Sequence, residues 1–465
     1  MRMLLAGEWI NGNRVCEVRN PYNEELIDTV PKANSAQVEK AYDFAAQYDH
    51  GLKAWDRFEV LNRFCTLLSE RADDFIRTIS LESGKTLKDA EIEVNRSLQT
   101  FLFSAEEAKR INGETLAVDA AAGLDKHIAI VIREPIGTVL AITPFNYPLN
   151  LVAHKVGPAL AANNPVIVKP SSLTPLSALK MAELLLEAGL PPHMIQVLTG
   201  DSAEIGDPLV TDTRVAKVSF TGSAEVGQAL ASKAGVTQLC LELGGNDPLI
   251  VLEDADLEAA VPICLDGAFG NNGERCTSIK RVIIEHRIAD NFVESLVCRT
   301  KSLRVGNQLD PNTDIGPLIT EAAATKVQTS VDNALKGRAQ LLCGGERKGA
   351  LYWPTILDHV PADDPLVVEE TFGPVAPVIR VDGFEEAIHV ANSTPYGLQS
   401  GIMTNNLQRA VEAAKRIEAG AVMINKAPGF RAEHLPFGGV KSSGFGREGV
   451  KYAVDSMTRQ KTIVI

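Results

Sequence analysis

The chain is poor in cysteine, with seven in 465 residues, at positions 16, 65, 240, 264, 276, 298 and 343. They form no C-x-x-C pair and no Cys/His cluster at metal-ligand spacing, so neither a disulfide framework nor a metal site is expected. Six of them are interpreted as small buried apolar residues. Cys276 differs, because Gly273, Arg275 and Thr277 give it a polar and flexible setting.

Long apolar runs and clusters of positive charge are lacking as well. No run approaches the roughly 20 residues of a membrane-spanning helix, and residues 1–15 lack the apolar core of a signal peptide. Lysine and arginine are scattered and the formal net charge is -13, which argues against nucleic acid or an anionic membrane as a partner. The cytoplasm is the expected compartment, in keeping with free thiols.

The sequence does have the composition of a globular protein, with 45% apolar and 23% charged residues. A chain of 465 residues is too long for one ordinary core and predicts two lobes. After helices over 36–50 and 56–111, short apolar runs alternate with helical ones, which is typical of a parallel sheet with crossover helices. The strands are expected at 139–143, 165–169, 195–199, 215–220 and 238–243.

One crossover helix is expected over 175–188, with Thr174 as its N-cap and Pro175 in its first position. The β-prone stretches 127–134 and 462–465 are expected to form a small projecting sheet that joins subunits, because unpaired strand edges need a partner. A second α/β series starts at 247–261. Its strands are expected near 280–285, 352–357, 375–381 and 398–403, and a helix near 288–303.

Two glycine-rich stretches bear on cofactor binding. GFGREG at 444–449 matches G-x-G-x-x-G by letter, but no strand precedes it and the chain ends before the required acidic residue, so we interpret it as a tight surface loop. In FTGSAEVG at 220–227, an expected strand runs into Gly222 and then into a helix starting near Ala224, where backbone N–H groups suit a pyrophosphate. Gly222, Ser223 and Gly227 are therefore candidate cofactor residues.

Four stretches resemble motifs of the aldehyde dehydrogenase family: ITPFNYPLN (142–150), VIVKPSSLTP (166–175), LELGGNDP (241–248) and NNGERCTS (271–278). FTGS, EETFGPV and PFGGVKSSGFGREG also match, so the resemblance covers nearly the whole chain. It implies an α/β fold of two doubly wound lobes, one dinucleotide-binding and one catalytic, plus a small oligomerisation sheet. The implied domains are dinucleotide-binding at 1–117 and 137–243, catalytic at 244–439, and an oligomerisation arm at 118–136 and 440–465 of a homodimer or homotetramer.

The resemblance assigns three catalytic roles. Cys276 is the implied nucleophile, which attacks the aldehyde carbon as a thiolate, and Arg275 beside it is expected to lower the thiol pKa. Asn146 is the implied donor to the oxygen that becomes negative, although locally it also suits a turn before Pro148. Glu242, at the end of an apolar strand, is the implied base that activates water to cleave the thioester, and a raised pKa suits this role.

The same resemblance implies NAD or NADP as cofactor. Lys169 is expected to bind the adenosine ribose, and Glu370 and Phe372 to place the nicotinamide ribose and ring. Many relatives carry Glu three residues after the lysine, where its charge repels a 2′-phosphate, but this chain has Ser172, so NADP should be tolerated. The other cofactor residues implied are Thr143, Pro144, Phe145, Gly200 and Ser223.

Arg96, His154, Arg275 and Arg431 fall where the family builds its substrate funnel. Guanidinium groups bind phosphate, phosphonate, sulfonate or carboxylate, and three of them in one pocket would be costly without an anion. The pattern resembles phosphonoacetaldehyde and non-phosphorylating glyceraldehyde-3-phosphate dehydrogenases, with lactaldehyde and sulfolactaldehyde enzymes as neighbours. The expected substrate is thus a small anionic aldehyde. Each arginine taken singly is equally well explained as a structural ion-pair partner.

Other functions stay open at this point. A broad-specificity or succinic-semialdehyde-type enzyme is the alternative within the family. A cysteine hydrolase would need a histidine that activates Cys276, and none of the eight histidines has a recognisable partner motif. A non-catalytic binding protein on the same scaffold is disfavoured because Cys276, Glu242 and Asn146 are all present.

Overall fold

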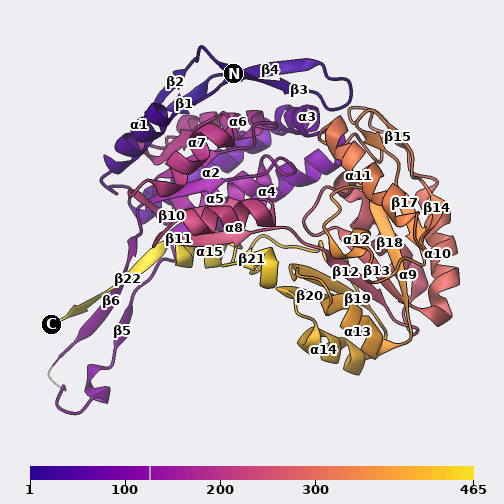
Figure 1. Cartoon of the computed structure of the whole chain (residues 1–465). Helices are drawn as coiled ribbons and strands as arrows, with labels where there is room; N and C mark the ends of the chain where they lie inside the picture. Colours follow the sequence, from indigo (N-terminus) through magenta and orange to yellow (C-terminus); the bar gives the residue numbers. More distant parts are fainter. Residues whose placement is uncertain (125–126) are drawn as a thin grey trace.

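The computed structural model describes residues 1–124 and 127–465. Two α/β lobes lie side by side, and a narrow arm of strands extends away from the first lobe (Figure 1). Residues 125 and 126, inside the expected arm, lie outside the described residues. The fold class predicted from the sequence is confirmed.

The first lobe is built on an eight-stranded sheet of order β2-β1-β9-β8-β7-β10-β11-β21. The five predicted strands form its parallel centre, where apolar side chains are buried on both faces. Its two N-terminal strands and β21 were not predicted, since each has only two or three residues. The strands are β1 (Met3–Leu5), β2 (Glu8–Ile10), β7 (Thr138–Ile142), β8 (Val166–Lys169), β9 (Ile195–Val197), β10 (Val215–Thr221), β11 (Gln238–Glu242) and β21 (Gly444–Phe445).

Helices cover both faces of this sheet (Figure 1). The region 56–111 is divided into three helices, with breaks at Arg71 and at Gly84, whose φ of 79° is left-handed. The helices are α1 (Ser35–Ala46), α2 (Ala54–Glu70), α3 (Ala72–Ser83), α4 (Leu87–Ala108), α5 (Asn150–Ala161), α6 (Leu176–Glu187), α7 (Ser202–Thr211), α8 (Ala224–Lys233) and α15 (Val450–Ser456).

The predicted N-cap of α6 was wrong by one residue. Pro175 takes the cap position, and its side chain forms no hydrogen bond with the first turn of the helix. Instead, the buried carboxylate of Glu82 on α3 accepts hydrogen bonds from the backbone N–H groups of Leu176 (2.7 Å) and Ser177 (3.0 Å). A long-range carboxylate therefore takes the role expected of Thr174, and no local pattern reveals it.

The second lobe contains a seven-stranded sheet of order β14-β17-β18-β13-β12-β19-β20, parallel except for β14. The predicted strands of this series are confirmed with small shifts of their ends. The strands are β12 (Asp247–Val251), β13 (Ile279–Glu285), β14 (Gln340–Cys343), β17 (Thr355–Asp358), β18 (Val375–Val381), β19 (Gln399–Met403) and β20 (Ala421–Ile424). The helices are α9 (Leu257–Phe269), α10 (His286–Thr300), α11 (Glu321–Ala334), α12 (Pro365–Val368), α13 (Phe384–Asn392) and α14 (Leu407–Arg416).

The arm is a three-stranded sheet of order β22-β6-β5, made of β22 (Thr458–Val464), β6 (Ala129–Pro135) and β5 (Glu114–Leu116). The predicted pairing of 127–134 with the chain end is confirmed, with Thr458 opposite Pro135 and Val464 opposite Ala129. The arm projects from the body, as expected (Figure 1). Two small hairpins complete the structure: β3 (Val15–Arg19) with β4 (Leu26–Pro31), and β15 (Arg347–Lys348) with β16 (Leu351–Tyr352).

The two lobes are joined directly through consecutive strands. Glu242 ends β11 of the first sheet, and after residues 243–246 Asp247 begins β12 of the second. The carboxyl edge of the first sheet, where ligands bind in open α/β sheets, therefore faces the amino ends of β12 and β13. The residues predicted to act on cofactor and aldehyde lie at this junction.

Candidate active site

Cys276 lies in the loop between α9 and β13, held in an unusual backbone conformation. Asn271, Asn272 and Gly273 all have left-handed φ angles, of 53°, 57° and 71°. A Cβ on Gly273 would lie 2.3 Å from the backbone of Gly373, so glycine is required there. The loop is thereby fixed rather than freely flexible, contrary to the expectation from its sequence.

Two cavities meet at the partly exposed Cys276. The first runs along the carboxyl edge of the first sheet, and Asn146, Glu242 and Phe372 line it. The second opens on the other side and is lined by Arg96, Tyr147, Arg275, Arg431 and Phe437, among others. A thiol between a groove for a dinucleotide and a separate funnel is the arrangement that aldehyde oxidation by hydride transfer needs.

Glu242 is buried beside this thiol, with 2% of its surface exposed. Neither carboxylate oxygen has a hydrogen-bond partner within the described part of the chain. Burial, together with the nearby Glu448, raises the pKa of Glu242 to about 8, against the opposing charges of Lys155 and Arg431. The raised pKa expected from the sequence is therefore present, and the group is suited to exchanging protons near neutral pH.

The pKa of the Cys276 thiol is also raised, because the thiol is largely withdrawn from solvent at the inner end of the cavities and lies near Glu242. The expectation that Arg275 lowers this pKa was wrong, since the guanidinium turns away and donates to the backbone carbonyls of Asp266 (2.5 Å) and Gly267 (2.9 Å). The cation that opposes the shift is Lys280. In the free site the thiol and the carboxyl group thus both favour their neutral forms.

Asn146 lies in the loop after β7 and lines the same cavity as Cys276. Its side-chain Nδ2 donates to the backbone carbonyl of Glu274 (2.9 Å), which leaves a second N–H available. The end of this loop is held by α4, because the Glu93 carboxylate accepts hydrogen bonds from the backbone N–H groups of Leu149 (2.8 Å) and Asn150 (3.0 Å). This carboxylate fixes the first turn of α5.

The predicted adenosine end of the groove contains Lys169, Ser172 and Gly200. Lys169 closes β8 and is buried, which lowers its pKa, and its Nζ contacts only the carbonyl of Pro170 (3.2 Å) within the described residues. Ser172 donates to the carbonyl of Gly200 (2.8 Å). Thr143 lies next to Lys169, and its hydroxyl, buried, has no partner among the described residues.

The predicted nicotinamide end contains Pro144, Phe145, Glu370 and Phe372, which line one cavity with Cys276. The rings of Phe145 and Phe372 meet edge to face, 5.9 Å apart. Glu370 accepts from Lys280 Nζ (2.8 Å) and from the N–H of Gly245 (3.2 Å), so its position is fixed. A side chain on Gly244 would collide with Glu370 at 2.3 Å, so this cradle needs glycine.

The glycine-rich turn after β10 has the form expected for binding a phosphate. Ser223 caps α8 by accepting from the N–H of Val226 (3.3 Å), and Gly222 and Ser223 line the groove. Gly227 instead allows close packing of α8, because a Cβ there would lie 2.3 Å from the side chain of Leu243. The turn at the N-terminus of α8 and the rings of Phe145 and Phe372 line the cavity beside Cys276, which suits the phosphates and the nicotinamide ring of a dinucleotide.

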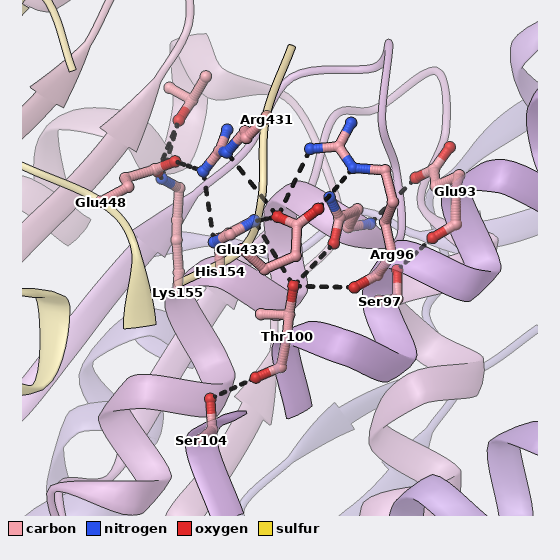
Figure 2. A network of polar contacts seen from close by, with 12 residues as sticks. Glu93, Arg96, Ser97, Thr100, Ser104, His154, Lys155, Arg431, Glu433 and Glu448 are labelled. Carbon is pink, nitrogen blue, oxygen red and sulfur yellow. Dashed lines mark hydrogen bonds and ion pairs between the residues drawn. The ribbon is translucent and has the colours of Figure 1, made fainter. Parts of the chain in front are cut away.

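The three predicted arginines all line the funnel in front of Cys276. Their expected need for an external anion is met in part by the protein, because Arg96 pairs with Glu433 (2.6 Å) and Arg431 with Glu448 (3.1 Å). His154 is buried, does not line either cavity, and contacts Glu433 (2.5 Å) and Arg431 (3.4 Å) with its two ring nitrogens. Figure 2 shows this network.

Several residues of the site were missed from the sequence. Lys280, in the expected strand 280–285, donates to the carbonyls of Arg275 (2.8 Å) and Cys276 (3.1 Å) and so fixes the nucleophile loop. Lys155 pairs with Glu448 (2.8 Å), and both are buried. A charged residue within an apolar stretch was the available signal for Lys155 and Lys280.

The interpretation of 444–449 as a surface loop was wrong in one respect. Gly444 and Phe445 form β21, which pairs with β11 beside Glu242, and Glu448 is buried. A Cβ on Gly444 would lie 2.0 Å from the carbonyl oxygen of Leu241. The glycines therefore allow a close approach to the strand that bears the base.

No cluster of three or more potential metal ligands occurs in residues 1–124 and 127–465. In the same residues, no helix combines the length and the apolar character needed to cross a membrane.

Comparison with known proteins agrees with this geometry. The sequence profile of the aldehyde dehydrogenase family matches residues 9–463. The 3-sulfolactaldehyde dehydrogenase of Priestia aryabhattai is 43% identical over 464 residues, covering 100% of this chain and 97% of that protein.

Two solved structures share the fold. One is an aldehyde dehydrogenase of Physcomitrella patens in complex with the product succinate (TM-score 0.97, 37% identity, covering 100% of this chain and 98% of that one). The other is the glyceraldehyde-3-phosphate dehydrogenase of Methanocaldococcus jannaschii in complex with NADP (TM-score 0.94, 40% identity, 97% and 99%). With a matching profile, relatives and site, the chain belongs to the aldehyde dehydrogenase family, as an NAD(P)-dependent aldehyde oxidoreductase.

Proposed function

We propose that the chain oxidises a small anionic aldehyde to its carboxylate, with Cys276 as nucleophile and water as the final acceptor of the acyl group. One observation carries the substrate class. Arg96, Arg275 and Arg431 line the funnel that ends at Cys276, and the Nη1 group of each has no protein partner in the described residues. Three guanidinium edges at one cavity suit a phosphate, phosphonate, sulfonate or carboxylate.

In the first step, the Cys276 sulfur bonds to the aldehyde carbon as the carbonyl π bond breaks, and the thiol proton leaves through the cavity to solvent, so that Glu242 stays free to act as base in the second step. The carbonyl oxygen becomes negative, and the free N–H of Asn146 together with the Cys276 backbone N–H stabilises it. Removal of such a donor typically lowers kcat by a factor of roughly 10² to 10³. Fixing the loops on either side, by Lys280 and Glu93, keeps both donors in place.

A bound nicotinamide dinucleotide supplies the hydride acceptor. Lys169 would hold its adenosine ribose, the turn at Gly222 and Ser223 its phosphates, and Glu370 and Phe372 its nicotinamide half. Loss of hydride from the tetrahedral carbon leaves a thioester on Cys276. Glu242 then takes a proton from water, which attacks the thioester and releases the carboxylate and the thiol. Branches of the family that transfer the acyl group to coenzyme A characteristically lack this base, so hydrolysis is proposed here.

Both NAD and NADP are expected to be used. Ser172 presents a hydroxyl, already bonded to Gly200, where many relatives have a carboxylate, so nothing at this position repels a 2′-phosphate. The NADP complex of the Methanocaldococcus jannaschii enzyme supports the same assignment.

The assembly and compartment belong to the same proposal. The arm carries exposed apolar residues at its tip and along β22, which supports a homodimer or homotetramer joined through the arm. The proposed domains need one change, because, of the described elements within the expected arm at 118–136 and 440–465, only β6 and β22 lie in the projecting sheet, whereas β21 and α15 belong to the first lobe. A cytoplasmic location is supported by the free thiols and the negative charge.

Steady-state kinetics test the substrate class. We expect kcat/KM for glyceraldehyde 3-phosphate, phosphonoacetaldehyde or sulfolactaldehyde to exceed that for acetaldehyde by at least about a hundredfold. Two hydrogen bonds between the arginines and the anion would stabilise the bound substrate by enough to give this factor. Preference for succinic semialdehyde would select the alternative within the family, and equal turnover of neutral and anionic aldehydes would contradict an anionic substrate. No reduced cofactor with any aldehyde would favour a non-catalytic binding protein.

A further inference from the structure

Glu433 occupies the centre of the polar network behind the funnel (Figure 2). Its carboxylate is buried, with 4% of the side chain exposed. One oxygen accepts from Arg96 Nε (2.6 Å), and the other contacts His154 Nε2 (2.5 Å) and Arg431 Nε (3.8 Å). A single buried carboxylate thus touches one residue from α4, one from α5 and one from its own loop.

The contacts of His154 determine which ring nitrogen carries the proton. Burial and the Arg431 charge lower the pKa of His154 against the opposing effect of Glu433 and Glu448, which favours the neutral ring. Arg431 Nη2 lies 3.4 Å from Nδ1 and only donates, so Nδ1 is the acceptor and Nε2 carries the proton. Nε2 therefore donates to Glu433, and His154 links Arg431 to the same carboxylate that binds Arg96.

The network leaves the Nη1 nitrogen of each guanidinium without a hydrogen-bond partner in the described residues. Arg96 uses Nε and Nη2 on Glu433, and Arg431 uses Nη2 on Glu448 and His154. The Nη1 group of each remains for a ligand in the cavity that both line with Cys276. The spacing between the two free groups is fixed by the carboxylate that joins their other edges.

We propose that Glu433 is a specificity-determining positioning residue, which orients Arg96 directly and Arg431 through His154 so that an anionic substrate holds its aldehyde carbon at Cys276. This inference rests on the proposed function. Glu433 touches no reacting atom, and it decides how well an anion held by the two arginines is aligned with the thiol. His154, expected from the sequence to bind substrate, acts through this carboxylate.

The test is Glu433→Gln, which keeps the shape and removes the charge that orders both arginines. For glyceraldehyde 3-phosphate we expect kcat to fall by about tenfold to a hundredfold, because a misplacement of about 1 Å has this effect. The KM for this substrate should change by less than about threefold, since both cations remain. For the neutral propionaldehyde, kcat and KM should both stay within about threefold.

Glu82→Gln is the matched control. Glu82 is equally buried and accepts three hydrogen bonds at α6, but it contacts none of the arginines. It should lower the melting temperature without changing the ratio of anionic to neutral kcat/KM. If Glu433→Gln does not fold, Glu433→Asp keeps the charge but is too short to reach both Arg96 and His154, and the same ratio should fall.

The outcomes separate the two proposals. A wild-type enzyme without preference for anionic aldehydes would remove the proposed substrate class. A wild-type enzyme with that preference, together with a folded Glu433→Gln or Glu433→Asp variant that fully keeps it, would overturn the role of Glu433 alone. Equal losses on both aldehydes would also overturn it, since they indicate a purely structural residue.

Discussion

At the scale of single residues, burial keeps two neighbouring acidic groups of the site in their neutral forms. Cys276 and Glu242 lie side by side, and burial raises the pKa of both, so neither is readily charged before the aldehyde enters. Such a pair titrates as a unit. The neutral resting thiol is less exposed to oxidation than a thiolate would be.

Replacing the nucleophile should separate chemistry from binding. In Cys276→Ser the attacking atom is a far weaker nucleophile, so we expect turnover to fall by at least about a thousandfold. Quenching of protein fluorescence by NADPH should still report dinucleotide binding, because Cys276 is one of many residues along the groove. Retained turnover would remove Cys276 from the mechanism.

The pKa of Glu242 gives a pH dependence with a definite sign. The base is active when ionised, so with its pKa raised to about 8 the steady-state rate should fall as the pH is lowered from about 9 to about 7. Glu242→Gln should give a burst of reduced cofactor close to one per site, followed by a stall at the thioester. Rapid-mixing absorbance at the reduced-cofactor band distinguishes this from normal steady turnover, which would contradict the assigned role.

Ser172 offers a test of cofactor choice. Glu in its place would direct a negative charge at the 2′-phosphate, so Ser172→Glu should lower kcat/KM for NADP by about tenfold or more through repulsion. The value for NAD should change much less. Titration of both cofactors at saturating aldehyde checks this, with Ser171→Glu, one residue away, as control.

The three catalytic assignments came from local motifs, and the structure brings those residues together. Glu433 and Glu448 were not found, because their roles depend on Arg96, His154 and Lys155, which are 279 to 337 positions away in the sequence. A local sequence pattern contains no information on such partners. The misjudged pKa effect of Arg275 has the same cause, since proximity along the chain does not fix where a guanidinium points.

At the scale of elements, α4 connects several parts of the site. Glu93, Arg96 and Thr100 lie at i, i+3 and i+7, on the face that packs against α5. Glu93 holds the first turn of α5, Arg96 reaches Glu433, and Thr100 donates toward Asn150 (3.1 Å). One helix face thus sets the position of the Asn146 loop and of the funnel.

Glu93→Gln should reveal this role in stability. Glu93 also pairs with Lys85 (2.5 Å), and both side chains are buried, so removing the carboxylate leaves an uncompensated ammonium group. We expect unfolding free energy to fall by about 3 kcal/mol, the lower end of the range for a broken buried pair. Urea titration measures this, and the exposed Glu91→Gln on the same helix should change stability by under about 0.5 kcal/mol.

Elements that are long or apolar on both faces were predictable. The parallel strands were found because a continuous apolar run bounded by turns is typical of a strand that is buried on both faces. The hairpin β3–β4 and the edge strands were missed, because short strands with alternating exposure are hardly distinct from loops. The capping of α6 by Glu82 was missed because the capping group lies 94 residues from the helix it caps.

At the scale of the whole molecule, the arm is the part with the least contact to the body. Leu116, Ile128, Val464 and Ile465 are exposed on it, and β22 and β5 each have a free edge within the described residues. Exposed apolar strand edges are avoided in monomeric proteins. This exposure supports the proposed oligomer, in which another subunit would cover the arm.

Removal of residues 458–465 tests this at the level of assembly. The truncated chain should elute as a monomer, whereas the intact chain should give a dimer or tetramer, with mass measured by light scattering during gel filtration. The pair Arg459→Ala/Lys461→Ala, which changes only exposed charges of β22, should keep the assembly. A monomeric intact chain would contradict the oligomeric arm.

The path of the last residues has a consequence for biosynthesis. Residues 444–464 provide the strand next to the base, the buried carboxylate of Glu448 and the last arm strand, yet the partners of these groups lie 202 to 335 residues earlier in the chain. A nascent chain still on the ribosome therefore has an open first lobe and an incomplete charge network. Residues 444–464 must be synthesised before this enzyme has a working centre, so products terminated before them are expected to be inert and ready for proteolysis.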